Sequence, residues 1–132
     1  MIDELIKEME QHIDCDDFEE IQEKCVSKIR ESNPGIDVVE SLLLFLESHP
    51  LSDFGIPGAI VHYVEQFYKN GYEDLLIASV VRRPTLHTVW MMNRIKNAGE
   101  NSEKYEKLLN DILTKQGVEE EIKNSVKEFL DK

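Results

Sequence analysis

His62 and Glu65 are the two side chains whose spacing most resembles that of metal ligands. Residues three apart lie on one face of a helix, and His and Glu at this spacing bind metals inside helical bundles. The sequence holds neither a second such pair nor a His-Glu-x-x-His string, so a metal site lacks enough ligands. Phosphate-binding loops, nucleophile elbows and Cys/His/Asn groupings are also missing from the sequence. We therefore expect no catalysis, metal or cofactor, and a metal-dependent hydrolase using this pair stays a distant alternative.

Acidic side chains gather between residues 14 and 23, and a calcium ion prefers several neighbouring carboxylates. An EF-hand loop counted from Asp14 would have Phe18 where an oxygen ligand is required and Glu19 where a glycine is required. The spacing instead predicts a capping box of Asp16 and Glu19 at a helix start, beside a solvated acidic face. A basic protein can dock on such a face. Its candidate binding residues are Asp14, Asp16, Asp17, Glu19, Glu20 and Glu23.

The most unusual segment runs from residue 82 to residue 94, because it holds the only tryptophan, two of the four methionines and three arginines. Leu86, Val89 and Met92 account for a buried stripe. Trp, Met and Arg are also enriched where proteins bind one another. Two interpretations stay open: Trp90 anchors the core, or it belongs to a binding face. The candidate residues of that face are Arg83, His87, Trp90, Asn93 and Arg94, completed by His62, Glu65 and Tyr68 from the preceding helix.

The net charge of −12 argues strongly against nucleic acid or an anionic membrane as the direct partner. The excess is uneven, since residues 1–31 carry a net charge of −7 and residues 32–55 one of −4. The remaining residues are close to balance, with +1 over 56–100 and −2 over 101–132. A basic protein is the natural complement of such a chain, although the charge also serves solubility.

The 132 residues correspond to one domain, which we expect to span residues 1–132. The longest apolar run, Leu42 to Leu46, is far shorter than the ~20 residues that cross a bilayer. The N-terminal Met-Ile-Asp-Glu lacks the basic and apolar regions of a secretion signal. We expect a cytoplasmic protein in which Cys15 and Cys25 are free thiols.

Apolar residues recur at intervals of three and four along almost the whole chain, which predicts an all-α protein of about eight short helices. Residues 36–48 are apolar nearly all round and are expected to form a buried central helix. Helix breaks are expected at Asn33-Pro34-Gly35 and in a loop from His49 to Pro57, with Pro57 opening the next helix. That helix should continue through Tyr68 and stop near Asn70-Gly71, and Gly99 should follow the end of a later helix.

Eight short helices with short connections do not suit a long up-down bundle. They suit antiparallel pairs that stack into an irregular α-solenoid of the HEAT-like kind, and a compact helical bundle is the alternative. No repeat of fixed period is visible in the sequence.

Two strings in the middle of the chain, Gly58–Tyr68 (GAIVHYVEQFY) and Arg83–Ile95 (RPTLHTVWMMNRI), carry a resemblance to a known class of proteins. This part of the sequence, roughly residues 55–97, resembles small all-α immunity proteins of bacterial polymorphic-toxin systems. The resemblance implies a cytoplasmic antidote that binds a toxin domain and blocks its active site. It transfers no individual contact residue.

The charge and the resemblance together lead to one expected function. Many delivered toxins are basic nucleases, and the acidic residues of the N-terminal half would occupy the basic cleft that such a toxin uses for RNA or DNA. We expect an immunity protein that neutralises a toxin in this way. The alternative is a helical adaptor or regulatory module without a toxin partner.

Overall fold

The protein is all-α, as its periodicity predicts: the computed structural model describes residues 2–52, 58–99 and 101–131, and these form eight helices and no strand. The helices are α1 (Ile2–Gln11), α2 (Phe18–Ser32), α3 (Asp37–Glu47), α4 (Gly58–Glu65), α5 (Tyr72–Arg82), α6 (Leu86–Asn97), α7 (Ser102–Thr114) and α8 (Glu120–Leu130). No helix within these ranges is long and apolar enough to cross a membrane.

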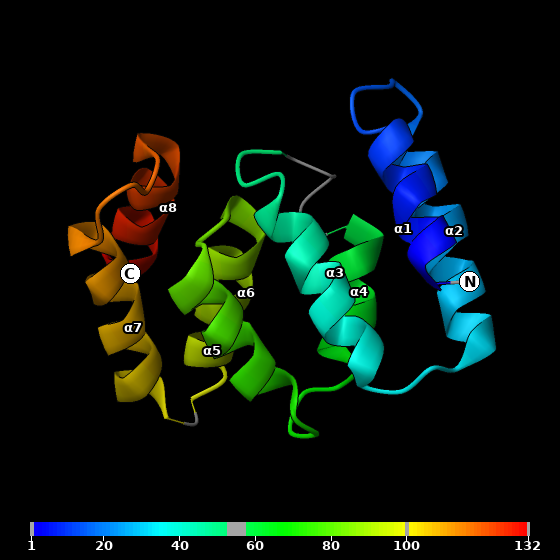
Figure 1. Ribbon diagram of the computed structural model, residues 1–132. Coiled ribbons are helices and arrows are strands. Elements are labelled where there is room, and N and C mark those ends of the chain that lie inside the picture. Colours follow the sequence, from blue (N-terminus) through cyan, green and yellow to red (C-terminus); the bar gives the residue numbers. More distant parts are fainter. Residues whose placement is uncertain (1, 53–57, 100, 132) are drawn as a thin grey trace.

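The helices follow one another in space in the order in which they follow along the chain. Figure 1 shows them as a row, with α1 and α2 at one end and α7 and α8 at the other. Helix α2 packs on α4, α3 packs on α5, and α6 packs on both α7 and α8. This packing is consistent with a compact helical bundle, the alternative architecture, and its two ends come from the two ends of the sequence.

Helix α3 supplies the centre of the core, as its composition predicts. Val39, Leu42, Leu43 and Leu46 have no exposed surface, and they belong to a single cluster of buried side chains that draws on all eight helices. Burial of such side chains is the main source of folding free energy. The burial of α3 is not all-round as expected, because Asp37 and Glu40 are exposed and the apolar Leu44 is 44% exposed.

Two of the predicted helix breaks are confirmed. Helix α2 ends at Ser32, and Asn33 takes a left-handed conformation (φ 50°) in which its N–H donates to the carbonyl of Arg30. Helix α6 ends at Asn97, and Gly99 lies just beyond it with a φ of 93° that glycine adopts without strain. Pro57, predicted to open α4, lies outside the described residues.

The predicted extent of α4 is wrong at its C-terminal end. The helix ends at Glu65 rather than near Asn70, so Phe67 and Tyr68 lie in the following turn. The N–H groups of Phe67 and Tyr68 donate to the carbonyls three residues earlier, those of Val64 and Glu65. This tightening ends the helical ladder, because each bond spans one residue fewer than in an α-helix.

The predicted capping box of Asp16 and Glu19 is also wrong. The residue before α2 is Asp17, whose side chain makes no capping hydrogen bond, and its backbone (φ −94°, ψ 14°) is not extended as a capping residue's usually is. A capping box forms instead at α6, where Thr85 Oγ1 accepts from the N–H of Thr88 and Thr88 Oγ1 accepts from the N–H of Thr85, both at 3.0 Å.

Candidate functional site

The six acidic candidates lie together on the surface at one end of the row of helices. Asp14, Asp16 and Asp17 belong to the turn between α1 and α2, and the three glutamates follow on the first half of α2. Figure 1 shows this turn projecting beyond the two helices. We call Asp14, Asp16, Asp17, Glu19, Glu20 and Glu23 the acidic end.

All six side chains of the acidic end are exposed, and within the described residues none forms an ion pair. The nearest basic residue on α2, Lys24, contacts Glu8 at 3.5 Å instead. Phe18 lies between these acids in the sequence and is buried, with 6% of its surface exposed. Backbone bonds from the N–H of Cys15 to the carbonyl of His12 and from Phe18 to Cys15 stabilise the turn.

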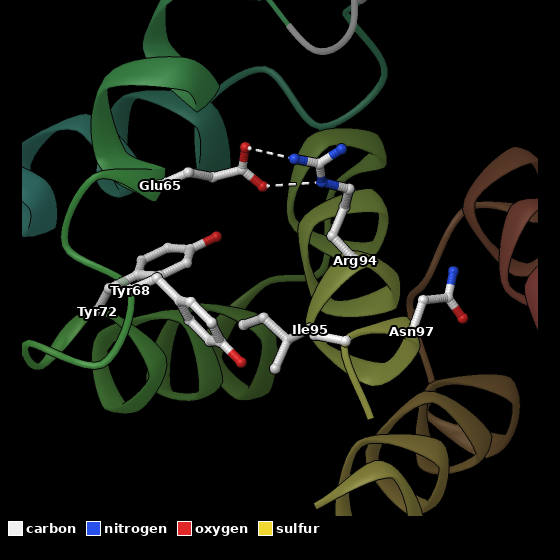
Figure 2. A pocket seen from close by; sticks show the side chains of 7 residues that line it. Glu65, Tyr68, Tyr72, Arg94, Ile95 and Asn97 are labelled. Carbon is white, nitrogen blue, oxygen red and sulfur yellow. Dashed lines mark hydrogen bonds and ion pairs between the residues drawn. The ribbon is translucent and has the colours of Figure 1, made fainter. Parts of the chain in front are cut away.

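A second candidate region is an open pocket of about 500 Å³ where the turn after α4, the start of α5 and the end of α6 meet. Figure 2 shows the Glu65 and Arg94 side chains meeting across it, with two tyrosine rings that extend from the α4 side toward α6. The residues that line this pocket are Glu65, Tyr68, Tyr72, Arg94, Ile95, Asn97 and Ala98.

An ion pair joins α4 to α6 at the pocket. Arg94 Nε donates to Glu65 Oε2 at 3.2 Å, and Arg94 Nη2 donates to Glu65 Oε1 at 3.3 Å. The guanidinium also lies over the ring of Trp90, 5.1 Å from its centroid. Since the Arg94 side chain is 57% exposed and that of Glu65 is 20% exposed, water screens this pair only in part.

Tyr72 is the most deeply buried polar side chain of the pocket, with 1% of its surface exposed. Its hydroxyl oxygen has no hydrogen-bonding partner among the residues that the structure describes. Burial raises the pKa of this hydroxyl far above its usual value of 10.0, and the nearby Glu65 carboxylate raises the pKa further. The group therefore keeps its proton at neutral pH and remains a hydrogen-bond donor.

Three of the predicted binding residues, Glu65, Tyr68 and Arg94, meet in this pocket, although they are up to 29 residues apart in the sequence. Trp90 is half-buried against the core, and its ring contacts the Arg94 guanidinium. His62 is exposed on α4, and the Glu65 carboxylate is bonded to Arg94.

The other candidate binding residues of the segment 82–94 do not line the pocket. His87 is 1% exposed, so in this structure it belongs to the core rather than to a binding face. Arg83 contacts Glu119, the residue that immediately precedes α8, and Arg83 Nη1 donates to Glu119 Oε1 at 2.9 Å. This bonding lowers the pKa of Glu119 and raises that of Arg83. Asn93 is half-buried on α6.

The sequence did not identify Tyr72, Ile95, Asn97 and Ala98 as pocket residues. Tyr72 opens α5 and Ile95 belongs to the buried stripe of α6, so each fits an ordinary core position in its own helix. No signal in the sequence joins them, because their proximity depends on how α5 packs on α6.

Within residues 2–52, 58–99 and 101–131, no three His, Cys, Asp or Glu side chains cluster as a metal site would require. None of the protein-family models, curated proteins or solved structures compared with the chain matches it.

Proposed function

We propose that the protein functions by binding a basic protein through the acidic end. The observation that carries this proposal is the set of six exposed carboxylates, none of them in an ion pair within the described residues, at one end of the row of helices. Carboxylates that are not neutralised within their own chain attract a positively charged surface most strongly.

Electrostatic attraction mainly accelerates the encounter of two proteins. Complementary charges raise association rate constants to about 10⁸–10⁹ M⁻¹s⁻¹ at low salt, compared with about 10⁵–10⁶ M⁻¹s⁻¹ for neutral surfaces. At physiological salt the Debye length is about 8 Å, so the attraction acts only over short distances. Six carboxylates lie in a stretch of ten residues, so their attraction adds at a partner that contacts the acidic end.

The resemblance of residues 55–97 to immunity proteins supports a specific partner, the basic domain of a bacterial toxin. In that function the acidic end occupies the cleft in which a nuclease toxin binds RNA or DNA, so the toxin is blocked without any reaction by the inhibitor. A basic partner that is not a toxin would correspond to the adaptor alternative.

Charge reversal at the acidic end tests the proposal. The variant carries Asp16→Lys, Asp17→Lys, Glu19→Lys and Glu20→Lys. Its matched control carries Glu103→Lys, Glu106→Lys, Glu121→Lys and Glu128→Lys, four exposed glutamates of α7 and α8. Both variants have a net charge of −4, because each substitution adds two charges to −12. Each variant places two lysines in the first turns of helices: at positions 19 and 20 in α2, or at positions 103 and 121 in α7 and α8.

The partner to use is the product of the reading frame adjacent to this gene. With that product at low salt, we expect the acidic-end variant to associate about tenfold or more slowly than the control. Circular dichroism should show similar helical content in both. Equal association rates for the two variants would refute docking through the acidic end. Binding without inhibition of a toxic activity would refute the toxin assignment and leave the adaptor.

A further inference from the structure

The Tyr72 hydroxyl is a donor that the described part of the chain leaves without an acceptor. Folded proteins pair nearly all of their buried polar groups, and an exception calls for an explanation such as a bound ligand. Phenylalanine would fill the same space at this position without the unpaired oxygen. The hydroxyl therefore calls for a hydrogen-bond acceptor other than the described residues.

The pocket beside Tyr72 has the size of a small-molecule site. Its volume of about 500 Å³ falls within the roughly 300–1,000 Å³ that ligand pockets span. The Tyr68 side chain and Ile95 give it an aromatic and an apolar wall, while Glu65 and Arg94 add hydrogen-bonding groups. Such a mixture of apolar walls and few polar groups is typical of ligand sites.

The charges at the pocket favour an uncharged ligand. Glu65 and Arg94 neutralise each other, so an anion would have to displace the Glu65 carboxylate from Arg94. A cation would have to displace Arg94 from Glu65. An uncharged ligand leaves the pair intact and avoids either cost.

Arg94 is the part of the wall that can move to admit a ligand. The Tyr72 oxygen has almost no contact with solvent, and the charges of both Glu65 and Arg94 act on it. The Arg94 side chain is 57% exposed, and both of its bonds to Glu65 are longer than usual for a charged pair. Binding at the hydroxyl therefore requires a shift of this side chain that keeps its pairing with Glu65.

We propose that this pocket binds a small uncharged molecule in which a carboxamide is attached to an aromatic ring. The Tyr72 hydroxyl donates to the amide oxygen, the Glu65 carboxylate accepts from the amide nitrogen, and the ring lies against Tyr68 and Ile95. This assignment is independent of the proposed docking through the acidic end, because the two regions share no residue.

Three flat molecules that differ mainly in charge test the proposal: benzamide, benzoate and benzamidinium. Each is titrated into the full-length ¹⁵N-labelled protein, and backbone NMR shifts are followed. We expect benzamide to bind most tightly, with saturable shifts at Tyr72, Ile95 and Ala98. Tighter binding of benzoate or benzamidinium would overturn the uncharged class. The absence of saturable shifts with benzamide up to its solubility limit would overturn the site.

Tyr72→Phe removes only the hydroxyl, and Tyr63→Phe is its matched control. Tyr63 is also buried but does not line the pocket. We expect Tyr72→Phe to weaken benzamide binding about fivefold, the equivalent of one hydrogen bond, and Tyr63→Phe to leave binding unchanged. Thermal unfolding should show that Tyr72→Phe is at least as stable as the wild type, because no hydrogen bond within the described residues is lost. Equal benzamide affinity in the two variants would overturn the role of Tyr72.

A carboxamide can also come from a polypeptide. N-acetyl-asparagine methylamide carries the amide without the aromatic ring, and we expect it to bind more weakly than benzamide. Tighter binding of the asparagine derivative would overturn the small aromatic ligand and assign the pocket to a polypeptide amide.

Discussion

At the scale of single residues, the pair of Arg83 and Glu119 connects the end of α5 to the start of α8. The two terminal guanidinium nitrogens, Nη1 and Nη2, donate to the two carboxylate oxygens, and only 32% of the Arg83 side chain and 27% of the Glu119 side chain are exposed. A bidentate pair of this kind is stronger than an ordinary surface ion pair. Arg83 therefore stabilises the packing of the helices rather than a binding face.

The pair predicts a pH-dependent effect of Glu119→Gln. Arg83 holds the pKa of Glu119 below its usual value of 4.5, so the pair stabilises the fold above that pH and the stabilisation is lost as the pH falls through the lowered pKa. In urea unfolding at pH 7 we expect the variant to be about 1 kcal/mol less stable than the wild type. At low pH, below the lowered pKa of Glu119, the difference should have disappeared, since Glu119 is then protonated.

Glu121→Gln is the control, because Glu121 is exposed and has no ion-pair partner among the described residues. It should follow the wild type at both pH values. A difference between Glu119→Gln and the wild type that stays the same at low pH would contradict an effect of the charged pair.

The residue types of the segment 82–94 left open whether Trp90 belongs to the core or to a binding face. Arg94 lines the pocket and contacts the Trp90 ring, whereas His87 is buried and Arg83 contacts Glu119. Spacing along a helix gives the face on which a residue lies. What that face meets depends on residues far away in the sequence.

At the scale of elements, the start of α4 depends on a side chain from α2. Gln22 is 2% exposed, and its Oε1 accepts from the N–H of Ile60 at 3.0 Å, in the first turn of α4. That N–H has no partner within its own helix. Position 58 favours glycine for two reasons. A Cβ there would lie only 3.1 Å from Gln22 Oε1, and the φ of 75° is one that glycine adopts without strain.

Replacing Gln22 by methionine keeps the length of the side chain and removes the acceptor. We expect Gln22→Met to reduce the free energy of unfolding by about 1–3 kcal/mol, because a buried N–H is left unsatisfied. Urea unfolding monitored by circular dichroism measures the change. Gln66→Met, at an exposed glutamine after α4, is the control and should remain within about 0.5 kcal/mol of the wild type. A Gln22→Met variant as stable as this control would show that α4 starts without help from α2.

Helix number and most helix positions could be predicted because apolar spacing and left-handed residues such as Asn33 are local features. The helix starts and ends that depend on turn geometry or on side-chain capping could not be predicted in the same way. The prediction extended α4 to Tyr68 because Phe67 and Tyr68 continue its apolar pattern, and the pattern does not register the tightened turn. The capping box at α6 uses Thr88 where the usual signature has a glutamate or glutamine.

At the scale of the whole molecule, helices that are near in the sequence also lie near one another in the structure. Acidic residues that are clustered in the sequence are therefore clustered on the surface. Consecutive helical pairs lie side by side, so the net charge of −7 over residues 1–31 stays at one end of the row. A fold with many long-range crossings would mix these charges. The acidic end was therefore predictable from the sequence, whereas the pocket between α4, α5 and α6 was not.

The docking of a basic protein on the acidic end is tested most directly by locating the docking face. Backbone hydrogen exchange of the free protein and of its complex with the adjacent-gene product locates the docking face. We expect protection on binding to concentrate in residues 14–23, where the turn and the first half of α2 carry the acidic end. Protection confined to α7 and α8, with residues 14–23 unchanged, would contradict it.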